Sequence, residues 1–145
     1  MNLRALFVVA LTLAAGAGCG GTTSRLTPDQ EKRFASEGIV RRAADLEFRY
    51  TRDPGGRGER WENRRASIVI TRSSLLIHKN DKIGLSIASG TRRVVTVARS
   101  GERVRIRSGS GRSEEVWSFV PPDDAPGWTA DIRALTRGEK AGSTH

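Results

Sequence analysis

A long run of alternating apolar and polar residues, divided only by short turn signals, constrains this chain most. From Ile39 onward the hydrophobic period is two, and Leu46, Phe48 and Tyr50 alternate with charged neighbours. Alternation of this kind marks a strand with one buried face. Similar short strand patterns recur at 66–70, 75–79, 83–87, 94–98, 104–106 and 114–120.

The segments between these patterns are rich in turn-forming residues. Residues 53–58 read Asp-Pro-Gly-Gly-Arg-Gly, and shorter signals stand at 73–74, 80–81, 100–101 and 109–111. Gly, Pro, Asn, Asp and Ser are the residues that turns prefer. Because the connections are short, seven antiparallel strands are favoured over βαβ units, whose crossovers are long.

A helix is predicted after the last strand. Pro121 and Pro122 end the sheet, and Asp123 or Asp124 can cap a helix that opens at Ala125-Pro126. Trp128, Ile132 and Leu135 fall on one helical face. Gly138 ends this helix, and residues 139–145 are expected to form a loose, disordered tail.

A second, shorter helix is predicted before the strands. Thr27 caps it, Pro28 suits its first turn, Gln30 completes a capping box, and Gly38 stops it. We therefore expect a helical segment at 27–38, with Phe34 as its main apolar residue. It would lie either on the barrel or on a membrane surface.

The amino terminus is built like an export signal. Arg4 belongs to a short basic region, residues 5–15 are apolar and uncharged, and small residues precede Cys19, the sole cysteine. This arrangement resembles the lipobox of bacterial lipoproteins, in which the signal is cut before a cysteine that carries a diacylglycerol. The resemblance implies a signal peptide at 1–18, lipidation of Cys19 and a flexible tether at 19–26.

Two alternatives to the lipobox interpretation remain open. Gly16 stands where the lipoprotein pattern usually has Leu, Val or Ile, so an ordinary secretory signal cut near Ala15 or Ala17 is one alternative. An uncleaved anchor is the other, although the apolar run falls short of the ~20 residues that a spanning helix needs. If the source is Gram-negative, Gly20 in place of the inner-membrane retention Asp favours the periplasmic face of the outer membrane.

Arginine dominates the charge of the chain. The net charge is +9, and arginine supplies 21 of the 25 basic residues. A basic exported surface is suited to anionic lipid headgroups, lipopolysaccharide or acidic glycans, and export argues against nucleic acid as a partner. The 127 residues that remain after cleavage suffice for one domain with a single core.

The order of elements resembles the pleckstrin-homology-like superfold. The most similar stretches are 67–71 with 74–77, 101–106, and 116–119 leading into the Trp128 helix. The resemblance implies a mainly β (α+β) fold: a small antiparallel seven-strand barrel over 39–138, with the C-terminal helix plugging one open end. Another small meander barrel, or a β-sandwich with an added helix, is the alternative.

The arginines form two candidate groups for binding an anionic surface. Arg103, Arg105 and Arg107 share one strand face, with Arg92, Arg93, Arg99 and Arg112 expected near them. Arg49, Arg52, Arg57, Arg60, Arg64 and Arg65 surround the first hairpin, where relatives of this fold often bind phosphoinositides, but the Lys–Arg spacing of that family is not clearly present. Solvated surface is the competing interpretation for both groups.

The remaining distinctive residues favour structure over catalysis. Trp117 and Trp128 are expected in the core, whereas Trp61 is the best aromatic candidate for a contact surface. His78 is expected in a surface turn, and the sequence contains no metal-ligand set of standard composition. Glu114 and Glu115 are adjacent on a strand and point to opposite faces.

These observations predict a non-enzymatic, lipid-anchored protein of the cell envelope, without metal or cofactor, whose barrel binds or scaffolds a protein partner. The alternative is a binder of anionic lipid, lipopolysaccharide or glycan through the arginine face.

Overall fold

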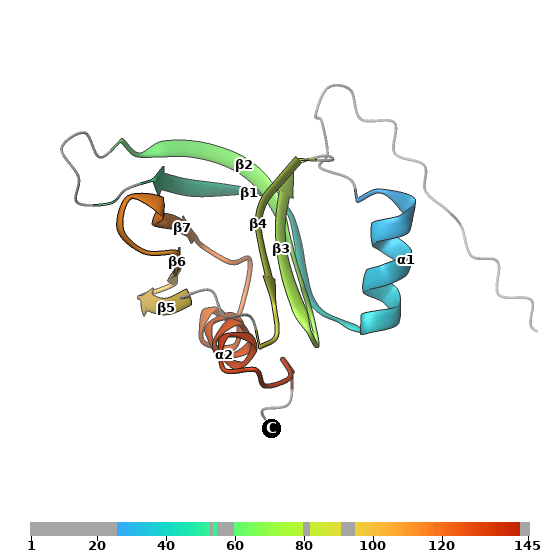
Figure 1. Ribbon diagram of the computed structural model, residues 1–145. Helices are drawn as coiled ribbons and strands as arrows, with labels where there is room; N and C mark the ends of the chain where they lie inside the picture. The colour runs from blue at the N-terminus through green and yellow to red at the C-terminus, as the bar shows by residue number, and fades with distance from the viewer. Residues whose placement is uncertain (1–25, 53, 55–59, 80–81, 91–94, 143–145) are drawn as a thin grey trace, which may run out of the picture.

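The computed structural model describes residues 26–52, 54, 60–79, 82–90 and 95–142 (Figure 1). Its elements, in chain order, are α1 (Pro28–Glu37), β1 (Ile39–Arg52), β2 (Glu62–Thr71), β3 (Ser74–Lys79), β4 (Lys82–Ala88), β5 (Val95–Ser100), β6 (Arg103–Ser108), the 3-10 turn η1 (Gly111–Ser113), β7 (Glu115–Phe119) and α2 (Ala125–Thr136). The predicted fold class is confirmed: the chain is mainly β, with a helix before the strands and a helix after them.

The seven strands form one curled antiparallel sheet in the order β4-β3-β2-β1-β7-β6-β5. β1 is the central strand, since its first part pairs with β2 only and its second part pairs with both β2 and β7. The two wings of the sheet, β1–β4 and β1 with β5–β7, face each other across the core (Figure 1).

A β-bulge bends β1 where it passes from one wing to the other. Ala43 pairs with Ile68 and Leu46 with Ala66, so β1 carries one extra residue here. Asp45 takes the left-handed conformation at φ 54°, and its carboxylate accepts two hydrogen bonds from Arg65. Because a bulge sharpens the local bend and twist of a strand, this site lets one strand serve both wings.

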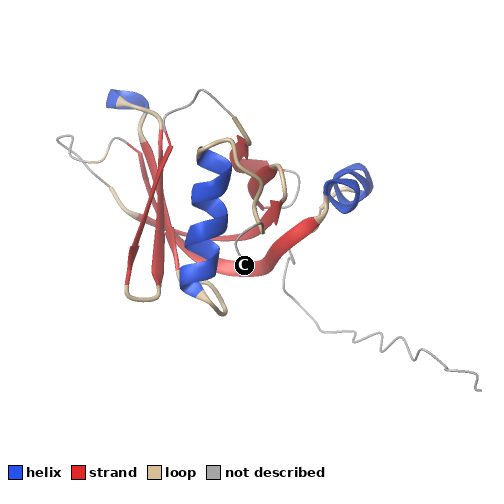
Figure 2. Cartoon of the chain, turned by 90° about the horizontal axis from the view of Figure 1, so that it is seen from below, coloured by secondary structure: helices blue, strands red, loops and turns tan. Residues whose placement is uncertain are grey.

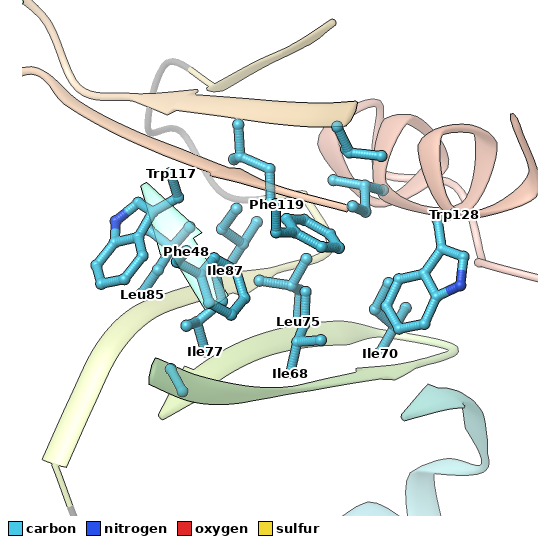
Figure 3. Packing of buried hydrophobic residues seen from close by; sticks show 14 of the residues in the cluster. Phe48, Ile68, Ile70, Leu75, Ile77, Leu85, Ile87, Trp117, Phe119 and Trp128 are labelled. Atoms are coloured by element: carbon cyan, nitrogen blue, oxygen red, sulfur yellow. The ribbon is translucent and has the colours of Figure 1, made fainter. Parts of the chain in front are cut away.

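The core fills the space between the wings and α2 (Figure 3). Trp117 and Trp128 are both buried, as predicted, and they lie at opposite ends of the core with Phe48 and Phe119 between them. The Phe119 ring meets Trp128 edge-on at 5.9 Å and lies 5.0 Å from Phe48. Aromatic contacts of this geometry add to the stabilisation that burial alone provides.

Helix α2 closes the gap between the two edge strands, β4 and β5 (Figure 2). Its buried face carries Trp128, Ile132 and Leu135, as the helical periodicity predicts. Arg41 of β1 holds α2 through ion pairs with Asp124 at its N-terminus and with the buried Asp131. Asp124 is also the N-cap and accepts from the Gly127 N–H at 3.1 Å. The helix is thus fixed by both packing and charge.

Helix α1 packs on the outer face of β2 and β3. Phe34 and Leu26 form a small apolar cluster with Val69 and Leu76, so α1 lies on the barrel rather than free of it. The predicted Thr27–Gln30 capping box is present. Leu26 is already buried, so the expected flexible tether cannot extend to residue 26.

The C-terminal tail is more ordered than expected. Ala141 is buried in the main core, and the N–H of Gly142 donates to the Asp131 carboxylate at 2.8 Å. Residues 139–142 therefore pack against the barrel instead of forming a loose tail. The sequence pattern missed this contact because a single small apolar residue carries no periodicity.

His78 also differs from expectation. It lies in β3 opposite Ser67, and only 1% of its surface is exposed. The prediction of a surface turn was wrong because His78 lies within β3, whose two faces are both buried from Ser74 to His78.

Candidate binding surface

The outer face of β1, β7 and β6 carries arginines on its two sides and short side chains along β7 between them. Phe48, Tyr50, Val104, Ile106, Trp117 and Phe119 all belong to the core cluster. Because side chains alternate along a strand, the residues between them point outward. These are Arg49 and Thr51 of β1, Val116 and Ser118 of β7, and Arg103, Arg105 and Arg107 of β6.

The strand register brings arginines from distant parts of the chain to either side of β7. Ser118 is paired with Arg49 on one side and with Arg105 on the other. Neighbouring strands lie about 4.8 Å apart, so the backbones of these two arginines are separated by roughly 10 Å. Two long cationic side chains therefore flank one short serine.

The centre of this face is recessed because the β7 side chains are short. Ser118 is 2% exposed and Val116 is 1% exposed, although both point away from the core. At the Val120 end a shallow depression of about 290 Å³ is lined by Glu47, Arg49, Arg103 and Val120. We call this feature the β7 groove. It is open at Val120, whereas Val116 and Ser118 lie beneath neighbouring side chains. Its walls are Glu47, Arg49 and Trp61 on one side and Arg103, Arg105 and Arg107 on the other.

Much of the positive charge along the groove is not neutralised. Arg107 forms an ion pair with Glu114 at 3.1 Å. Arg103 donates a long 3.5 Å hydrogen bond to the Ser118 hydroxyl. Within the described part of the chain, Arg49, Arg103 and Arg105 have no carboxylate partner. These three guanidinium groups remain available to an external anion.

Trp61 adds an aromatic surface to the same wall. It directly precedes β2, is partly exposed as predicted, and has the Arg49 guanidinium 5.1 Å from its ring centroid. A cation placed over an indole ring is held by the ring quadrupole. The contact orders the Arg49 side chain at the edge of the groove.

Most arginines of the first hairpin are occupied elsewhere. Arg52 pairs with Glu115, Arg64 with Glu62, and Arg65 with Asp45. Arg60 is exposed beside Trp61, and Arg57 lies outside the described residues. The structure therefore does not show the hairpin arginines converging on one ligand.

Of the arginines expected near the β6 arginines, the structure describes Arg99 and Arg112. Arg99 pairs in register with Val104, a core residue, so it does not share the outer face of Arg105. Arg112 is exposed in η1, whereas Arg92, Arg93 and Cys19 lie outside the described residues.

Arg49 flanks the first hairpin, as the sequence indicates, and the pairing of β1 with β7 also brings it to the same face as the β6 arginines. The sequence placed it with the first hairpin, because nothing local shows that β7 returns to pair with β1. The alternating pattern at 115–119 was visible, but the partner of that strand was not.

The described residues contain no cluster of three or more His, Cys, Asp or Glu side chains suited to a metal ion. Glu114 and Glu115 serve different partners, Arg107 on the outer face and Tyr50 with Arg52 at the barrel end. None of the helices in the described residues is long and apolar enough to cross a membrane.

Neither the models of known protein families nor the curated proteins include a match to this chain.

Proposed function

We propose that this protein is a non-enzymatic binding module of the cell envelope, anchored by lipid on Cys19, and that it holds a protein partner in the β7 groove. The observation that carries the proposal is the pairing of Ser118 with both Arg49 and Arg105. This register places two guanidinium groups without a carboxylate partner among the described residues on either side of one short side chain.

The composition of the groove favours a protein partner. Protein interfaces are enriched in arginine and tryptophan and depleted in lysine, and their energetic centres are often Trp, Tyr or Arg. The groove has four arginines and Trp61 in its walls and no lysine. Arginine also keeps its charge when desolvated and offers a fork that matches a carboxylate.

The position of the anchor supports a partner away from the anchoring membrane. Helix α1 and the β5–β7 wing lie at opposite ends of the molecule (Figures 1 and 2). Seven residue steps from Cys19 to Leu26 reach at most about 25 Å. A domain of this size is roughly 35 Å across. A tether shorter than the domain favours an orientation in which the groove is turned away from the bilayer that holds the lipid.

Anionic lipid, lipopolysaccharide or an acidic glycan is the second candidate ligand. The free charges of Arg49, Arg103 and Arg105 favour it, and such binding would weaken steeply with salt. The short tether favours an anionic surface other than the anchoring bilayer.

The anchor is tested separately from the groove. In the source organism, the full-length chain should incorporate an alkyne-labelled fatty acid and fractionate with membranes, whereas C19S should do neither. Labelling that persists in C19S would overturn the assignment of Cys19.

The groove is tested by photo-crosslinking in cells. A photo-reactive residue replaces Val120 at the groove, or Ile83 on the β4 edge as a positional control; both side chains are exposed. We expect a discrete adduct from position 120 that disappears in R49E/R105E. The variant K79E/K82E, with the same change in charge on the β3–β4 hairpin, should retain it. An adduct that survives R49E/R105E would exclude the groove as the binding surface.

A further inference from the structure

The shape of the β7 groove also bears on the form of its ligand. Arg103, Arg105 and Arg107 follow one another at every second position of β6. Side chains on one face of a strand repeat at about 6.7 Å. The cationic wall is therefore a linear array with a fixed spacing, running alongside β7.

An extended polypeptide has the same repeat. Its side chains at i, i+2 and i+4 also stand about 6.7 Å apart on one face, so acidic residues at alternate positions would meet successive arginines. A helix would present its charges at a spacing of three or four residues, with an overall diameter of about 10 Å. Val116 and Ser118 are covered by neighbouring side chains, so the ligand lies across the arginine side chains, where the strand repeat of the partner matches that of β6.

The opposite wall supplies the second half of the recognition. Arg49 stands across Ser118 from Arg105, so a chain in the groove is contacted from both sides. Trp61 offers a flat apolar surface next to Arg49. At the Val120 end, Glu47 faces Arg103 across the depression and disfavours an acidic group at that end. The two ends of the groove therefore differ in charge, which would fix the direction of a bound chain.

We infer that the occupant of the β7 groove is an extended segment of a partner protein with acidic residues at alternate positions. This inference rests on the proposed function, because it names the ligand of the same groove. The acidic side chains pair with Arg103, Arg105 and Arg49, and the intervening residues point to solvent.

The test uses the full chain carrying C19S and two fluorescent peptides of equal composition. One alternates glutamate and serine, and the other has all its glutamates in one block. We expect the alternating peptide to bind more tightly by about five-fold, because it can place a carboxylate at each arginine. R105E should weaken the alternating peptide by about ten-fold and K79E/K82E should leave its affinity unchanged.

A peptide of opposite charge controls for misfolding of the variants. A peptide alternating lysine and serine should bind R49E/R105E more tightly than it binds the parent chain, which an unfolded variant would not achieve. Equal affinity for the alternating and block peptides, or no effect of R105E, would overturn the inference.

Vesicles of phosphatidylcholine with phosphatidylglycerol form the third arm. Sedimentation with these vesicles, lost in R105E and without peptide binding, would replace the acidic segment by a lipid surface. If neither probe binds while the position-120 adduct still depends on Arg49 and Arg105, the proposed function stands and the ligand class is wrong. If that adduct is also independent of the arginines, both proposals fail.

Discussion

At the scale of single residues, Glu37 connects α1 to the barrel. Its carboxylate accepts hydrogen bonds from the hydroxyls of Thr71 at 2.7 Å and Ser74 at 2.6 Å, and from Arg33 at 2.7 Å. Partial burial opposes ionisation, but the hydrogen bonds from Ser74, Arg33 and Thr71 outweigh it and lower the pKa of Glu37 to about 2.

This shift predicts a stability difference that depends on pH. Since the folded pKa lies below the ordinary carboxyl value of 4.5, ionised Glu37 stabilises the fold above pH 4.5 and loses this effect as the pH falls toward 2. We expect E37Q to lower the free energy of urea unfolding by about 1–2 kcal/mol at neutral pH. The difference in unfolding free energy between E37Q and the parent chain should nearly vanish near pH 2. The exposed Glu102 supplies the control, and an E102Q loss equal to that of E37Q would contradict the prediction.

Replacing either of two buried serines by alanine should change the free energy of unfolding in opposite directions. The Ser108 hydroxyl is buried and has no hydrogen-bond partner among the described residues, whereas the Ser74 hydroxyl is bonded to Glu37 and Thr71. An unsatisfied buried hydroxyl carries a desolvation cost. S108A should therefore raise the free energy of unfolding by about 0.5–1 kcal/mol, and S74A should lower it by about 1 kcal/mol. Chemical denaturation measures both; destabilisation by S108A would indicate an ordered water at this hydroxyl.

At the scale of elements, the start of α2 depends on close contact at Gly127. A β-carbon there would overlap the Asp124 carboxylate and the Arg41 guanidinium. Gly-to-Ala changes inside a helix normally stabilise by about 1 kcal/mol. Here we expect G127A to destabilise by about 1–2 kcal/mol, because it displaces the N-cap. In a D124A background, G127A should cost less stability, because the N-cap that it displaces is already gone. If the stability losses of G127A and D124A simply add, the two residues do not act through the same cap.

The elements differ in how far the sequence predicts them. The caps of α1 and the apolar face of α2 follow from local residues, and both were correctly predicted. The strands were also visible, since their alternation is local. The pairing of β7 with β1, the bulge at Asp45 and the burial of Ala141 were not, because each depends on partners distant in the chain. The predicted site was incomplete for the same reason: the β6 arginines share a face by local periodicity, while Arg49 joins them only through β7.

At the scale of the whole molecule, α2 joins the two ends of the sheet. β4 and β5 are the edge strands, and α2 contacts both. L135A creates a cavity in the main core and should cost about 3 kcal/mol. Because one helix secures both edges, hydrogen exchange should accelerate in β4 and β5 together.

The matched control for this prediction is F34A. Phe34 is also buried, but in the separate cluster beneath α1. Its loss should accelerate exchange in α1 and leave β5 protected. Faster exchange confined to one edge strand in L135A would show that the two wings unfold independently.

The central position of β1 has a mechanical consequence. If the protein is anchored and bound as proposed, it is under tension whenever anchor and partner move apart. The load enters at Ile39 and passes along β1, which is bonded to β2 on one side and to β7 on the other. Those ladders are loaded in shear, with many hydrogen bonds sharing the force. α1 is attached by one small cluster and a few polar contacts, so it should detach from the sheet first. Its detachment would lengthen the connection between anchor and partner before the sheet itself unfolds.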